Sequence, residues 1–245
     1  MKLAFLLFGL SLALATPLAA QGVVRAGSTT AGQPASGLNP TTNQWEGVSV
    51  ELLEAISEDA AFKVKFTPML FGELQSALIG NKIDVIAASF GKSPARQKVV
   101  DFTLPYGSYR DVLVVPATDS KTYRSLADLK GMSIATPSGS SYVEPLKAAG
   151  AAVILVSTPP EGITELEAGR VQGVVDNGLQ LRYRLKKENR SNLRIVDSYD
   201  PILVGQLAFA VRKGDAELLN KLNASLAKLR ESGSLKAITT KWGLE

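Results

Sequence analysis

Residues 89–106, SFGKSPARQKVVDFTLPY, contain one arginine, Arg96, shortly after a run of small residues. Small side chains at Ala88, Ser89 and Gly91 let a ligand come close to backbone N–H groups. A guanidinium adds two parallel N–H donors that match the two oxygens of a carboxylate. The segment therefore predicts a carboxylate-binding loop with Arg96 as its charged clamp. The alternative is an ordinary strand-to-helix turn whose arginine forms a surface ion pair.

A second loop of this kind occupies residues 137–142, PSGSSY. Gly139, Ser140 and Ser141 precede a predicted helix, and the free N–H groups of a helix N-terminus favour negative charge. Serine is also a common helix cap, so the same pattern suits a turn without any ligand. Two loops of small polar residues are therefore candidates for one anion site.

The sequence contains no histidine and no cysteine. A Ser-His-Asp or Cys-His catalytic set therefore cannot be built, and zinc loses the two ligand types it favours. We find no Walker A loop, no G-x-G-x-x-G segment and no calcium loop in the sequence. These observations predict a binding protein rather than an enzyme, with no metal ion and no cofactor.

The N-terminus has the pattern of an export signal. Lys2 precedes the apolar run LAFLLFGLSLALA, and the small residues of TPLAA offer a cleavage site near Ala20. We expect residues 1–20 to be a signal peptide that directs the protein to a bacterial periplasm. Without cysteine the protein is not expected to be a lipoprotein. The formal net charge of +4 is small, and no basic stripe with aromatic residues indicates a nucleic-acid partner.

The elements that must position these loops alternate between β-rich runs and helical patterns, which predicts an α/β fold. The predicted strands include residues 23–28, 63–69, 84–89, 111–117 and 171–177. Amphipathic helices are expected at residues 48–62 and in the C-terminal region, where Leu218, Leu222, Leu226 and Leu229 form an apolar stripe. The pattern indicates two βα-rich lobes, and a cleft between two lobes is a natural site for a small molecule.

Taken together, these segments resemble family 3 of the bacterial extracellular solute-binding proteins. The most specific match is residues 71–106, with an aromatic residue, a helix, DVI, a small-residue loop, Ser-Pro-x-Arg and VDF-x-x-PY. The resemblance implies a two-lobe periplasmic-binding-protein fold of type II, in which helices flank a central, mostly parallel sheet in each lobe. Lobe 1 would comprise residues 22–107 plus 206–245 and lobe 2 residues 108–205, with crossovers near 106–111 and 200–205.

The resemblance also implies a function. It suggests a monomeric periplasmic receptor of an ABC importer, which captures a small carboxylate, most simply an amino acid, by closing its lobes and delivers it to a membrane permease. Arg96 matches the residue that clamps the ligand α-carboxylate, and Phe71 matches an aromatic residue that packs on the ligand side chain. Further residues match positions that complete the carboxylate site: Ala88, Ser89, Gly91, Ser140 and Ser141.

Two departures from the family pattern leave it open how the α-ammonium and the side chain of the ligand would be bound. The acidic residue that would bind the α-ammonium falls on Asn177, with Asp176 just before it. Adjacent residues of a strand point to opposite faces, so we expect only one of the two to reach the ligand. An aromatic residue of the family falls on Gly32, for which Gln33, Thr29 and Trp45 are candidate replacements.

Two alternatives therefore stay open. The ligand could lack a charged amine, as an organic acid or a modified amino acid does. The protein could also be an enzyme that resembles cyclohexadienyl dehydratases, which need a positioned acid. In that branch of the family the acid lies three residues after the ammonium-binding position, and here Gln180 holds the place, which leaves Asp176 as the nearby candidate.

Overall fold

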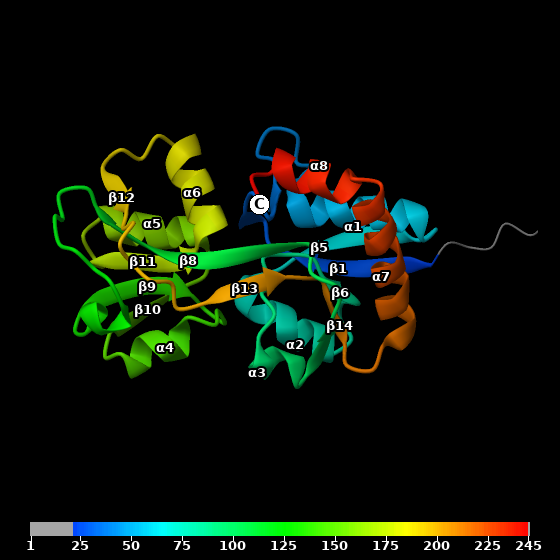
Figure 1. The fold of residues 1–245 in the computed structure, drawn as a ribbon, viewed down its shortest axis with the longest axis horizontal. Helices are drawn as coiled ribbons and strands as arrows, with labels where there is room; N and C mark the ends of the chain where they lie inside the picture. Colours follow the sequence, from blue (N-terminus) through cyan, green and yellow to red (C-terminus); the bar gives the residue numbers. More distant parts are fainter. Residues whose placement is uncertain (1–21, 245) are drawn as a thin grey trace, which may run out of the picture.

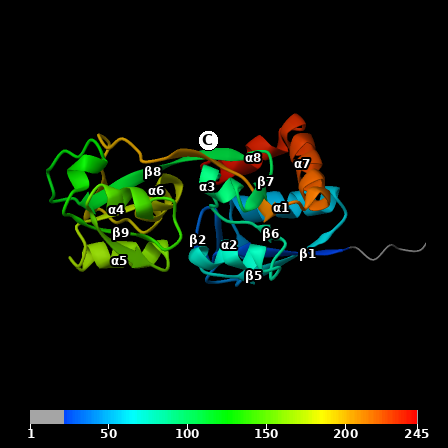
Figure 2. The same cartoon turned by 90° about the horizontal axis from the view of Figure 1, so that it is seen from below.

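The computed structural model describes residues 22–244, so the predicted signal peptide, residues 1–20, lies outside the described residues. The chain forms two lobes that lie side by side, joined by the long strand β8 (Gly107–Pro116) and by β13 (Val204–Leu207) (Figure 1). These two strands pair antiparallel and run along one edge of the molecule (Figure 2). The predicted two-lobe α/β fold is confirmed.

Lobe 1 contains a five-stranded sheet in the order β5-β1-β6-β14-β7. Its strands are β1 (Val23–Ser28), β5 (Lys63–Pro68), β6 (Val85–Ile86), β7 (Val100–Phe102) and β14 (Ala210–Arg212). A small second sheet comprises β2 (Ala31–Gly32), β3 (Ser36–Leu38) and β4 (Trp45–Glu46). The helical elements are α1 (Val48–Asp59), η1 (Phe71–Glu73), α2 (Leu74–Ile79), α3 (Pro94–Gln97), α7 (Ala216–Glu231) and α8 (Ser234–Lys241).

Lobe 2 contains a six-stranded sheet in the order β10-β9-β11-β8-β12, with β13 paired to β8. Its other strands are β9 (Ser133–Pro137), β10 (Ala152–Val156), β11 (Gly173–Asn177) and β12 (Leu193–Ile195). The helical elements are η2 (Leu126–Leu129), α4 (Val143–Ala148), α5 (Pro159–Glu167) and α6 (Gly178–Lys187). We propose the lobe limits expected from the sequence, because the chain passes between the two sheets near residues 107 and 207.

Both sheets are mostly parallel, as expected from the sequence, and each contains one strand that runs the opposite way. The first strands of each lobe pair parallel, as β1 does with β5 and β6, and β9 with β10 and β11. The crossover strand β8 runs antiparallel to its neighbours in lobe 2, and β14 does so after the chain returns to lobe 1. The antiparallel pairs are therefore the result of a chain that passes between the lobes twice.

Helices cover both faces of each sheet, so each lobe has three layers (Figure 1). In lobe 1 the apolar faces of α1 and α7 meet one face of the sheet through Leu53, Ile56 and Leu222, while Leu74 and Leu78 of α2 cover the other face. In β8 the side chains alternate, because Leu113 packs in one cluster of lobe 2 and its neighbour Val114 in another. Burial of apolar surface on both sheet faces supplies the main stabilisation.

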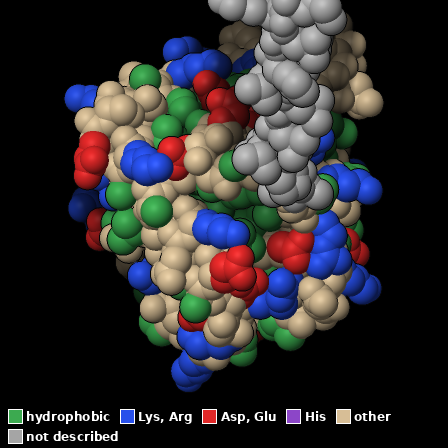
Figure 3. Space-filling model, turned by 90° about the vertical axis from the view of Figure 1, so that its right-hand side faces the viewer, with side chains coloured by type: hydrophobic (Ala, Val, Ile, Leu, Met, Phe, Trp, Pro, Cys, Tyr) green, Lys and Arg blue, Asp and Glu red, His purple; other side chains and the backbone are tan. Residues whose placement is uncertain are grey.

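The surface of lobe 1 carries charges of both signs. Basic and acidic side chains are interspersed on the face shown in Figure 3. Several form exposed or half-exposed ion pairs, such as Lys213 with Asp101 and Lys228 with Asp59. Pairs of this kind add little stability. Within residues 22–244, no helix is both long enough and apolar enough to span a membrane.

Asp111 ties the two crossover segments together. Its side chain is 1% exposed, and its oxygens accept hydrogen bonds from the backbone N–H of Ile202 at 3.0 Å and of Leu203 at 2.7 Å. Burial raises the pKa of the Asp111 carboxyl, and the two N–H donors act in the opposite direction. One side chain in β8 therefore accepts the hydrogen bonds of two backbone N–H groups in the segment that leads into β13.

We expect Asp111→Ala to destabilise the protein by about 2–4 kcal/mol, because two backbone N–H groups lose their acceptor inside the fold. The free energy of unfolding from urea titration measures this loss. Asp200→Ala is the matched control, since this exposed residue lies beside the same segment and has no side-chain hydrogen bond in the structure. An equal loss in both variants would show that Asp111 does not hold the crossover.

Candidate functional site

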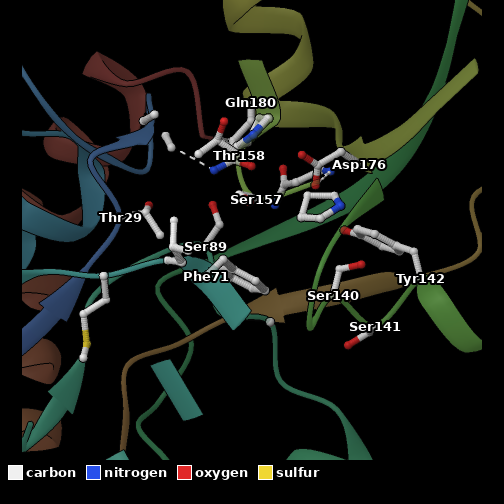
Figure 4. Close-up of a pocket in the computed structure, with 18 of the residues that line it drawn as sticks. Thr29, Phe71, Ser89, Ser140, Ser141, Tyr142, Ser157, Thr158, Asp176 and Gln180 are labelled. Carbon is white, nitrogen blue, oxygen red and sulfur yellow. Dashed lines mark hydrogen bonds between the residues drawn. The ribbon is translucent and has the colours of Figure 1, made fainter. Parts of the chain in front are cut away.

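A cleft between the lobes gathers nine of the ten predicted site residues (Figure 4). Lobe 1 contributes Thr29, Phe71, Ser89, Gly91 and Arg96. Lobe 2 contributes Ser140, Ser141, Asp176 and Asn177. The tenth, Ala88, is 1% exposed and packs in the core of lobe 1, where its carbonyl accepts hydrogen bonds from Ser49 and Tyr106.

Arg96 is positioned by the first turn of α3. Ser93 is the N-cap, with extended backbone angles, and its hydroxyl accepts a hydrogen bond from the Arg96 N–H at 3.3 Å. Pro94 follows at the first helical position, where its fixed φ suits a helix start. The Ser-Pro-x-Arg segment therefore acts as a capped turn that directs Arg96 into the cleft.

The Arg96 guanidinium is a buried cation that has no acidic partner among the described residues. The residue is 7% exposed, and its N–H groups donate to the carbonyls of Gly91 at 2.8 Å and Gly139 at 3.1 Å. Burial lowers the pKa of Arg96, but an arginine side chain stays charged in proteins. Two of the five N–H donors of the side chain are used, so donors remain for an anion in the cleft.

Two phenylalanines hold the Arg96 guanidinium from the side. Its central carbon lies 3.8 Å from the ring centroid of Phe90 and 5.5 Å from that of Phe71. The two rings are also in contact, with centroids 5.9 Å apart. Stacking on aromatic faces stabilises a cation and restricts its rotation. Phe71 lines the cleft, so it can contact both the clamp and a ligand.

Ser89 and Gly91 complete the lobe 1 side of the anion site in different ways. The Ser89 hydroxyl is buried and has no hydrogen-bond partner in the structure, so it is available to a ligand. A side chain at position 91 would overlap the ring of Tyr109, which comes from the crossover strand β8. Glycine is therefore required here by the close approach of Tyr109 rather than by the ligand alone.

The lobe 2 loop between β9 and α4 lies opposite Arg96. The Ser140 hydroxyl is 3.2 Å from that of Thr136, and Ser141 lines the same side of the cleft. Gly139 has φ +74°, a conformation that glycine adopts readily. A Cβ on Gly139 would lie 2.8 Å from the Cα of Gly72, so the two lobes meet here backbone to backbone.

Asp176 is the acidic residue of the cleft. The side chain is 4% exposed; Oδ1 accepts a hydrogen bond from the Asn177 N–H at 2.7 Å, and Oδ2 is buried without a partner. Burial raises the pKa of Asp176 to about 7, although the Asn177 N–H and the charge of Arg184 act in the opposite direction. An unpartnered carboxylate oxygen in a cleft is a site for a cationic or donor group.

We expected only one of Asp176 and Asn177 to reach the ligand, and the structure places both residues in the lining of the cleft. Asn177 is the last residue of β11 and also the N-cap of α6, where its Oδ1 accepts a hydrogen bond from the Leu179 N–H at 2.9 Å. Its φ and ψ of −54° and 121° depart from those of a regular strand. The alternation of a strand therefore does not extend to its final residue.

Several cleft residues were not predicted as site residues: Tyr109, Tyr142, Ser157, Thr158 and Gln180. Thr158 is the N-cap of α5 and accepts a hydrogen bond from the Glu161 N–H at 3.4 Å. The sequence STPPEG carries the threonine cap and proline that signal this helix start, so a strand-to-helix loop facing the cleft could have been inferred.

Among the described residues, three hydrogen bonds join the lobes across the cleft. Besides the bond from Arg96 to Gly139, Gln180 donates to the carbonyl of Gly32 at 2.9 Å and Arg184 donates to that of Ala31 at 3.1 Å. The last two start from α6 in lobe 2 and end on β2 in lobe 1. The structure is therefore that of a closed cleft.

Two lobes joined by paired crossover strands and closed over a buried charged cleft define a protein that binds a small solute between its lobes. The sequence model of the bacterial extracellular solute-binding proteins, family 3, matches residues 24–245. The chain belongs to this family.

Individual proteins with known descriptions are similar over most of the chain. A probable amino-acid ABC transporter-binding protein of Haemophilus influenzae is 31% identical over 196 residues, 80% of this chain and 75% of that protein. An ancestral arginine-binding protein bound to glutamine has a TM-score of 0.84 at 31% identity and covers 92% of this chain and 99% of its own. An ancestral amino-acid-binding protein, described as a precursor of cyclohexadienyl dehydratase, has a TM-score of 0.81 at 26% identity and covers 90% and 95%.

The raised pKa of Asp176 makes a prediction for the ligand-free protein. Between about pH 4 and 7 the folded state holds a proton at Asp176 that the unfolded chain releases, so this group makes stability fall as the pH rises. We expect Asp176→Asn to be more stable than the wild type at pH 8 by about 1–3 kcal/mol and to lose this advantage toward pH 5. Urea titrations of both proteins at the two pH values measure it. A stability difference that does not change with pH would contradict the burial of an ionised Asp176.

Proposed function

We propose that this protein is the solute receptor of an ABC importer and binds a free α-amino acid by closing its two lobes. It performs no catalysis and transfers the ligand to a membrane permease. Membership of the solute-binding family supports the receptor role. The ligand class is inferred from the charges in the cleft.

A single observation carries the assignment: one cleft contains a buried arginine and a buried carboxylate that are not paired with each other. Arg96 has free N–H donors, and Asp176 has a free oxygen. An α-amino acid carries a carboxylate and an ammonium group on one carbon, so it supplies both missing counter-charges at once. The Ser89 hydroxyl and the Ser140–Ser141 loop add hydrogen-bonding groups for the carboxylate.

The two alternatives make different demands on the cleft. An organic acid without an amine would satisfy Arg96 and leave Asp176 buried without a partner, which costs binding energy unless the carboxyl is protonated. A dehydratase needs a positioned acid, and Gln180 instead donates a hydrogen bond to Gly32 across the lobes. Asp176, with a pKa of about 7, is the acid that such a reaction would have to use.

The cellular setting follows from the same proposal. We propose that residues 1–20 act as a signal peptide and that the mature protein is a monomer in the periplasm. The sequence has no cysteine to carry a lipid. We infer the permease partner from the similar protein of Haemophilus influenzae, which is described as a probable amino-acid ABC transporter-binding protein.

The test is calorimetric titration of refolded, ligand-free protein with α-amino acids and with their deaminated analogues. We expect at least one α-amino acid to bind and its analogue without the amine to bind far more weakly. Arg96→Ala should cost about 2–5 kcal/mol of affinity, because it leaves the ligand carboxylate without its clamp in a closed cleft. Arg124→Ala is the control, since this arginine is exposed on lobe 2, away from the cleft lining.

Three results would reject parts of the proposal. Tighter binding of the deaminated acids would show that the ligand is an organic acid and not an amino acid. Conversion of prephenate or arogenate by the purified protein, lost in Asp176→Asn, would make it an enzyme. Equal affinity of the wild type and Arg96→Ala for the same ligand would show that Arg96 does not bind the ligand carboxylate.

A further inference from the structure

Arg96 and Asp176 are the only charged side chains that line the cleft within the described part of the chain. In the function proposed above, the ligand carboxylate and ammonium engage these two residues. Every other lining side chain is neutral, so a charge on the ligand side chain would meet no counter-charge in the closed cleft. Burying an unpaired charge is expensive even where some water remains.

One end of the cleft is small and polar. A Cβ on Gly32 would come within 3.0 Å of Gln180 Nε2 and would overlap the Thr29 hydroxyl, so these three residues lie against one another. In Figure 4 Thr29, Thr158 and Gln180 lie toward one end of the cleft, and Asp176, Tyr142 and Ser140 lie toward the other. The glycine lets Thr29 of lobe 1 and Gln180 of lobe 2 pack against the backbone of β2, so neutral polar groups of both lobes form this end of the cleft.

These polar groups keep both donors and acceptors free. Gln180 Nε2 is used by the Gly32 carbonyl, which leaves Gln180 Oε1 as an acceptor. The Thr158 oxygen accepts from the Glu161 N–H, which leaves its hydroxyl hydrogen as a donor. Asn177 Nδ2 is a buried donor without a partner. Neutral groups that both donate and accept match an amide or a hydroxyl, because these ligand groups also do both.

Arg184 does not supply a free charge to this end of the cleft. Its guanidinium donates to the carbonyl of Ala31 and forms an ion pair with Glu188 at 2.7 Å. The side chain of an arginine or lysine ligand would find no lining anion except Asp176, which the α-ammonium already occupies. An acidic ligand side chain would find no lining cation except Arg96, which the α-carboxylate already occupies.

We propose that the protein selects α-amino acids whose side chains are polar and uncharged, with an amide or hydroxyl group, and discriminates against arginine, lysine, glutamate and aspartate. This specificity rests on the proposed function as an amino-acid receptor. It differs from what a direct transfer from the similar ancestral arginine-binding protein would predict, although that protein is bound to glutamine in its structure.

The first test is a titration of refolded protein with glutamine, asparagine, serine and threonine, and with arginine, lysine, glutamate and aspartate. We expect the tightest neutral ligand to bind at least about a hundredfold more tightly than any charged one. Charged amino acids that bind as tightly as the neutral ones would overturn this proposal and leave the proposed function intact. Failure of every amino acid to bind would overturn the proposed function, and the specificity with it.

The second test changes one lining residue. Thr158→Asp keeps an N-cap oxygen for α5, since aspartate caps helices at least as well as threonine, and adds a carboxylate to the cleft. We expect the affinity for arginine relative to glutamine to rise at least about tenfold. Thr158→Asn is the matched control of the same shape without the charge. It also removes the threonine hydroxyl, and it should change the ratio far less than Thr158→Asp. A ratio that changes equally in both variants, or in neither, would show that charge balance in the cleft does not set the specificity.

Discussion

The cleft depends on a buried cation, Arg96, that has no acidic partner within residues 22–244. Arg96 is held by a capped turn from one side, by the rings of Phe71 and Phe90 from another, and by two carbonyl oxygens, none of which carries a full negative charge. Desolvating a charge without a counter-ion is unfavourable. The cleft is therefore complete only when an anion from outside occupies it, and the same argument with opposite sign holds for Asp176.

Closure and recognition use the same residues. Arg96 binds the lobe 2 carbonyl of Gly139, so its position depends on the lobes being closed. Helix α6 has two roles, because Asn177 caps it at the cleft while Gln180 and Arg184 reach across to β2. A ligand that binds the closed state better than the open one shifts the population toward closure. Ligand binding in the cleft and closure of the lobes are therefore linked in one equilibrium.

Much of the site could be predicted from local signals. The small-residue loop and Ser-Pro-x-Arg indicated a clamp, and the structure places Ser89, Gly91 and Arg96 together in the cleft. Ala88 was not separable from its neighbours by type, yet it lies in the core while Ser89 lies in the cleft. Asp176 and Asn177 both line the cleft because β11 ends at Asn177. The residue types do not show where the regular alternation of a strand stops. The STPPEG segment signals the helix start at Thr158, whereas the place of Gln180 depends on how the two lobes face each other, which follows from tertiary structure and not from a local pattern.

The contact between Gly72 and Gly139 limits how far the lobes can close. Backbone meets backbone at this point, where a Cβ on Gly139 would lie 2.8 Å from the Cα of Gly72. At this point main-chain atoms, which cannot change rotamer, block a closer approach of the two lobes. In the receptor proposed above, such a contact would keep the outline of the closed lobes the same for ligands of different shape.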